Sequence, residues 1–92
     1  MTWNQHHSRS ERLAAEAESA TRAGDADRAK ELYRQAAAEE SAAFGHLSTE
    51  KIRSRGITAV SAVSLFYKGQ DYEAAERLAR GEPLYVEPNP QT

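Results

Sequence analysis

The first part of the chain repeats its apolar residues with the period of an α-helix. Leu13, Ala17 and Ala20 recur on one face of a segment that is otherwise rich in strong helix formers. Ser10 can cap the start of this helix by accepting a backbone N–H bond, and Gly24 can end it in the left-handed conformation. We therefore expect a first helix from Ser10 to about Gly24.

A second, longer helix is predicted after Asp25, which can cap it. Its apolar residues form one broad stripe that Glu40 interrupts. The stripe consists of Ala29, Leu32, Tyr33, Ala36, Ala43, Phe44 and Leu47. The helix is expected to extend from Asp25 to about Leu47, and a break between Gly45 and Thr49 is the alternative.

The body of the third helix is clear from the sequence, but the residue at which it starts is not. Ser48 and Thr49 precede Glu50 like a capping signal, whereas Gly56 interrupts the helical run further on. The apolar positions after Gly56 have helical spacing without strict alternation, which favours a helix over a strand. These positions are Ile57, Val60, Val63, Phe66 and Tyr67.

A turn over residues 68–70 and a cap at Asp71 lead into a fourth helix, which Gly81 and Pro83 terminate. Its inner face comprises Tyr72, Ala75, Leu78 and Ala79. The pattern as a whole predicts an all-α fold of two antiparallel helical hairpins, with four helices and an extended second helix. We expect a flexible tail over 1–9, the helical domain over 10–82 and a proline-rich tail over 83–92.

Length and composition narrow the function classes. The chain has 92 residues, enough for one domain, and its large alanine content predicts a thin core. Twelve basic and fourteen acidic side chains give a formal charge of -2, which disfavours binding to nucleic acid or to an anionic membrane. The chain contains no cysteine, and it has neither a signal-like nor a membrane-spanning apolar run. We expect a cytoplasmic protein.

Candidate catalytic residues are few. His46 and Glu50 share a helix face only if the second helix continues past Gly45, and two ligands do not make a metal site. His6 and His7 fall in the predicted tail. Adjacent Glu39 and Glu40 point about 100° apart on a helix, so they are interpreted as surface charge, with Glu40 pairing with a neighbouring helix as the alternative.

No phosphate-binding loop, Ser-His-Asp set or HExxH motif is present. Lys51, Arg53 and Arg55 form the only basic cluster, interpreted as a solvated face. We therefore expect no enzyme activity, no cofactor and no bound metal.

Two stretches share one plan: a helix, a turn containing glycine and aspartate, and a helix with alanine at its close crossing. This plan resembles the tetratricopeptide repeat, whose helical hairpins are about 34 residues long. In the first stretch Gly24 matches the turn glycine, Ala29 the small crossing residue, Tyr33 the large aromatic and Ala36 the next small residue.

In the second stretch Phe66 matches the large residue of the first helix, Tyr72 the aromatic after the turn and Ala75 the small crossing residue. Ala29 and Ala75 are 46 positions apart, which is longer than one repeat and implies either an extended second helix or an insertion between the hairpins.

The resemblance implies a module for protein–protein contact. Ligands of this family lie along the first helices of the hairpins, which here places the partner-binding groove at Glu11, Glu18, Ile57, Val60, Ser64, Tyr67 and Lys68. The alternative interpretation is that Ile57, Val60 and Tyr67 are core residues.

The competing hypothesis is self-association, because fewer than three such repeats rarely bury enough apolar surface alone. The oligomer interface is assigned to Phe44, Leu47 and Ile52, together with Trp3 or Tyr85 if the tails dock. We expect a homo-oligomer, with peptide binding by a monomer as the alternative.

Overall fold

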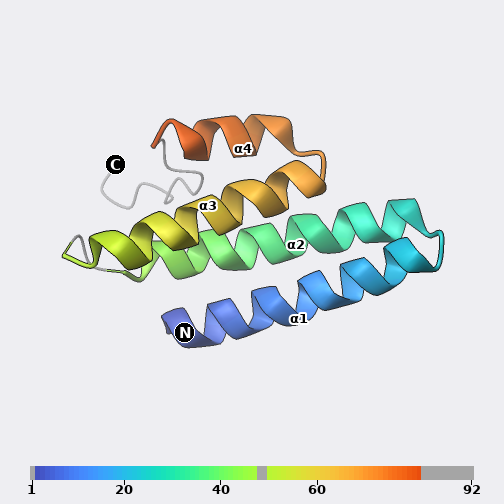
Figure 1. The fold of residues 1–92 in the computed structure, drawn as a ribbon, viewed down its shortest axis with the longest axis horizontal. Coiled ribbons are helices and arrows are strands. Elements are labelled where there is room, and N and C mark those ends of the chain that lie inside the picture. Colours follow the sequence, from blue (N-terminus) through green and yellow to red (C-terminus); the bar gives the residue numbers. More distant parts are fainter. Residues whose placement is uncertain (1, 48–49, 82–92) are drawn as a thin grey trace, which may run out of the picture.

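The computed structural model describes residues 2–47 and 50–81. These residues form four helices and no strand: α1 (Trp3–Arg22), α2 (Ala26–Gly45), α3 (Ile52–Lys68) and α4 (Tyr72–Ala79). Consecutive helices run antiparallel and pack in chain order, from α1 to α4 (Figure 1). The predicted all-α fold of helical hairpins is confirmed. Helix α2 ends at Gly45 rather than near Leu47 and has 20 residues, as many as α1, so the alternative of a break after Gly45 holds rather than a continuous helix to Leu47.

The start of α1 differs from the prediction. The helix begins at Trp3, and Thr2 and Gln5 form a capping box in which each side chain bonds the other's backbone N–H. Ser10, the predicted cap, is a buried residue inside the helix. Residues 3–9 are therefore helical rather than a flexible tail, because Thr2 supplies the local cap and the first turns pack on the rest of the fold. The predicted C-terminal tail, 83–92, lies outside the described residues.

The two hairpin turns have the same backbone geometry. Gly24 and Gln70 occupy the left-handed region, with φ of 81° and 61°, and the next residue in each turn caps the following helix. Asp25 N–H donates to the Ala20 carbonyl and Asp71 N–H to the Phe66 carbonyl, each at 2.9 Å, as in a Schellman motif. Both aspartate caps were predicted. The left-handed residue of the second turn is Gln70 rather than the neighbouring glycine.

Gly69 has a different role, which is close approach. It is buried, and a Cβ placed on it would lie 2.7 Å from Cγ of Arg34 and 3.1 Å from the Arg34 backbone nitrogen. Its carbonyl accepts a 2.7 Å hydrogen bond from Nε of Arg34. A glycine here lets the end of α3 contact the middle of α2.

The core consists of two clusters made largely of small residues, in keeping with the thin core that the alanine content predicts. One cluster joins α1 to α2 and consists of Ala17, Ala20, Ala29 and Leu32. The other joins α2, α3 and α4 and consists of Ala37, Ala62, Phe66, Ala75 and Leu78. Small residues at the crossings bring the helices close but leave limited apolar area buried.

Candidate interaction surface

Large hydrophobic side chains are exposed on one part of the described surface only. Ile57, Val60 and Tyr67 of α3 are 62%, 70% and 63% exposed, and Tyr72 at the start of α4 is 55% exposed. Ile52, the first residue of α3, is 77% exposed. Among the described residues, α1 and α2 contribute no large hydrophobic of this kind. We call the surface formed by Ile57, Val60, Tyr67 and Tyr72 the α3 face.

The sequence of α3 explains this surface. Residues 56–67 contain no charged side chain, so three turns of the helix are uncharged on every side. The inner side buries Thr58, Ala62 and Phe66 against the fold, and the larger aliphatic residues are left outside. A helix without a charged face normally requires cover all round, and here the fold covers one side.

The α3 face continues onto α4 through an aromatic contact. The rings of Tyr67 and Tyr72 meet edge to face, with centroids 5.0 Å apart. This contact stiffens the end of the face next to the second hairpin turn. Exposure of Ile57, Val60 and Tyr67 also rules out their alternative interpretation as core residues.

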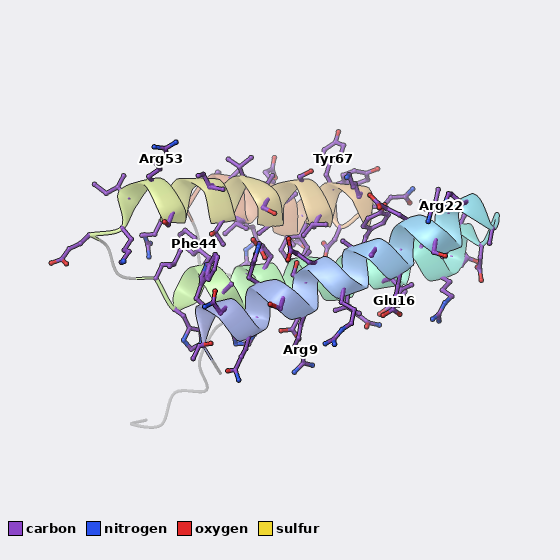
Figure 2. All side chains as sticks on the ribbon, turned by 60° about the horizontal axis from the view of Figure 1, so that its bottom comes forward. Arg9, Glu16, Arg22, Phe44, Arg53 and Tyr67 are labelled. Carbon is purple, nitrogen blue, oxygen red and sulfur yellow. The ribbon has the colours of Figure 1, made fainter. Side chains whose placement is uncertain are left out.

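The groove predicted between the first and third helices stays a prediction. Figure 2 shows the Tyr67 side chain on α3 pointing away from α1. All seven residues assigned to this groove are exposed. Glu11 lies 3.6 Å from Nε2 of His7, and Nζ of Lys68 lies 5.7 Å from the centre of the Tyr33 ring.

The three residues assigned to an oligomer interface occupy different environments. Phe44 is half-buried beneath the guanidinium of Arg55, which lies 4.3 Å from the ring centre. Arg55 Nη1 also donates a hydrogen bond to the Leu47 carbonyl at 2.8 Å, so this arginine links the segment after α2 to the first turn of α3. Ile52 is the exposed member of the set. Arg55 is thus engaged within the fold rather than part of a solvated basic face.

A polar seam joins the first turns of α1 to α2. Nδ1 of His6 lies 2.8 Å from Oε1 of Glu39, and Nδ1 of His7 lies 3.0 Å from Oε1 of Glu40. Glu40 is 2% exposed. Pairing of Glu40 with a neighbouring helix is therefore confirmed, whereas Glu39 is held by His6 and Arg9 rather than being free surface charge.

Aromatic contacts extend the seam to α3. The Trp3 ring stacks on His7 with centroids 4.7 Å apart, and its Nε1 donates to Oγ1 of Thr58 at 3.4 Å. Trp3 therefore docks within its own chain. The seam went unpredicted because its partners are 33 residues apart, although an antiparallel hairpin that turns near Gly24 places the first turns of α1 beside the second half of α2.

The described residues offer no group of three histidine, aspartate or glutamate side chains placed to hold a metal ion. Since α2 ends at Gly45, His46 and Glu50 do not share a helix face, and the His46 ring lies against His6 instead. In the part of the chain that the structure describes, no helix has both the length and the apolar character needed to cross a membrane. Comparison with models of known families, with curated proteins and with solved structures finds no match to this chain.

Proposed function

We propose that this chain is a non-catalytic protein–protein interaction module that associates with a second copy of itself through the α3 face. The observation that carries the proposal is the concentration of exposed large hydrophobics on α3 and the first turn of α4, over a helix that lacks charge for three turns. Contiguous exposed apolar patches on soluble domains are typical of interaction sites.

The form of the face favours a helix as its occupant. Ile57, Val60 and Tyr67 lie on one side of α3 at spacings of three and seven residues, so a facing helix can place its own side chains between them. In an antiparallel pair of α3 helices, the α3 face of each copy packs against the same face of the other copy. The formal charge of -2 per chain opposes this contact only weakly at physiological salt.

The resemblance of the two hairpins to tetratricopeptide repeats supports the same class of function. Repeat arrays bury the outer surfaces of their helices against neighbouring repeats, and two hairpins provide few such neighbours. A second copy of the chain supplies the missing contact. The alternative function is that of an adaptor, in which the α3 face of a monomer receives an apolar helix of another protein.

The test is the solution mass across a concentration series, measured by light scattering coupled to size exclusion, for the wild type and for Val60→Glu. We expect a mass that rises toward the dimer for the wild type and a monomer for Val60→Glu, because the substitution places a charge at the centre of the α3 face. Ala15→Glu is the matched control, since Ala15 is exposed on α1 and the added charge is the same.

A wild type that stays monomeric at every concentration contradicts self-association and leaves the adaptor function. A dimer that persists in Val60→Glu but dissociates in Phe44→Ala places the interface at the junction of α2 and α3 instead. In each case thermal unfolding of the variant must remain cooperative, which separates loss of contact from loss of fold.

A further inference from the structure

A groove lies between α2 and α4. It has a volume of about 910 Å³, and the buried Phe66 of α3 forms part of its wall. The α2 wall is lined by Ala38, Ser41, Ala42, Gly45 and His46, and the α4 wall by Asp71, Glu73, Ala74 and Arg77.

The groove exists because both walls carry small residues where they face each other. Ala38, Ala42 and Gly45 follow each other at one-turn spacing on α2, opposite Ala74 of α4. The eight-residue α4 packs mainly on α3 and makes little contact with α2. Space is therefore left beside α2 that large apolar side chains can fill.

We propose that the chain's own C-terminal segment, residues 82–92, folds back into this groove and fills it with Leu84 and Val86. Helices α2 and α4 run in the same direction (Figure 1), so the C-terminal ends of both helices lie toward the same end of the groove. Arg77 and Gly45 line that end, and the chain leaves α4 at Gly81, only four residues beyond Arg77.

The backbone at Gly81 turns the chain off the helix axis. Gly81 has a φ of 80°, in the left-handed region, and its N–H donates to the Leu78 carbonyl at 2.9 Å. The same geometry ends α1 at Gly24, where the chain reverses and packs back on the preceding helix. The backbone at Gly81 thus already begins a reversal.

The length and composition of the segment fit the space. Eleven extended residues reach about 36 Å, whereas the seven steps from Ala38 to Gly45 rise only about 10 Å along α2. Pro83, Pro88 and Pro90 favour an extended conformation, in which alternate side chains share one side. Leu84 and Val86 then point together at the small residues of α2.

Engineered disulfides test the proposal directly, because the chain contains no cysteine. In the full chain, Ala42→Cys combined with Leu84→Cys is expected to form an intramolecular disulfide in most molecules on mild oxidation, scored by non-reducing electrophoresis and mass spectrometry. The control pair, Ala15→Cys with Leu84→Cys, places one thiol on the exposed side of α1 and is expected to cross-link far less.

Equal cross-linking of the two pairs would overturn the proposal, and a disulfide that joins two chains would show that the groove takes the segment of a neighbouring copy. Thermal unfolding tests the docking independently, with variants that contain no engineered cysteine. Replacing Leu84 and Val86 together by serine is expected to lower Tm by about 5–10 °C, whereas Gln91→Ser leaves it unchanged. An unaltered Tm in the double serine variant refutes the docking.

Discussion

Removing His7 is expected to destabilise the fold far more than its position near the N-terminus suggests. Nδ1 of His7 lies 3.0 and 3.2 Å from the two carboxylate oxygens of Glu40, which is 2% exposed. In His7→Ala the buried carboxylate keeps its desolvation but loses this donor, a change that typically costs about 3–5 kcal/mol. Because the His7 side chain is one-third exposed, water can partly replace it, and we expect a loss of about 2–4 kcal/mol.

The loss expected for His7→Ala is large compared with the total free energy of unfolding. A domain of this length is stable by roughly 5–14 kcal/mol, so His7→Ala should remove a large share. The assay is urea unfolding at neutral pH, followed by far-UV circular dichroism. Fluorescence of Trp3 is unsuitable as the only signal, because the indole ring stacks on the very imidazole that is removed.

Two further variants isolate the cause. Glu11→Ala removes the other carboxylate near His7, which is 3.6 Å from Nε2 and 70% exposed, and should cost less than about 0.5 kcal/mol. His7→Phe combined with Glu40→Leu removes both polar partners, keeps a ring against Trp3 and should lie within about 1 kcal/mol of the wild type. The reasoning fails if His7→Ala costs less than about 1 kcal/mol, or if the paired replacement is as damaging as the single one.

The glycines and turns give further predictions for the free energy of unfolding, each measured by chemical denaturation. Gly69→Ala should lower it by about 1–2 kcal/mol because the new Cβ meets Arg34, whereas Gly56→Ala should raise it by about 0.5–1 kcal/mol because its Cβ meets no atom within 4 Å. Gln70→Gly should raise it by about 0.5–1 kcal/mol by relieving a left-handed residue, while Gly24→Ala should lower it by about 1 kcal/mol. Equal effects of the two alanine substitutions in α3 and its cap would contradict the close approach at Gly69.

Local signals in the sequence were sufficient for most helix ends. Asp25 and Asp71 cap the helices that they were predicted to cap, because a cap depends on residues within one turn. The start of α1 was missed although Thr2 and Gln5 fit the capping-box spacing. Ser10 also fits a cap by residue type, and only the packing of Trp3 and His7 on distant helices selects the earlier start.

The orientation of α3 is a different case, because its sequence does not define one inner side. Residues 56–67 are uncharged all round, so helical periodicity alone allows several faces to be buried. The fold buries the small residues Thr58 and Ala62 with Phe66, since small side chains permit close contact with α2. The larger Ile57 and Val60 are then outside, a choice that follows from helix packing rather than from hydrophobicity.

This arrangement sets the energy available for assembly. Full burial of a large apolar side chain contributes about 1.5–3 kcal/mol, so four side chains that are more than half exposed hold about 4–8 kcal/mol per copy. A symmetric pair would gain about twice this amount, against roughly 4–15 kcal/mol for the lost freedom of two bodies. The balance favours an association that responds to concentration over an obligate dimer, which is why a mass measured at one concentration cannot decide the question and a series can.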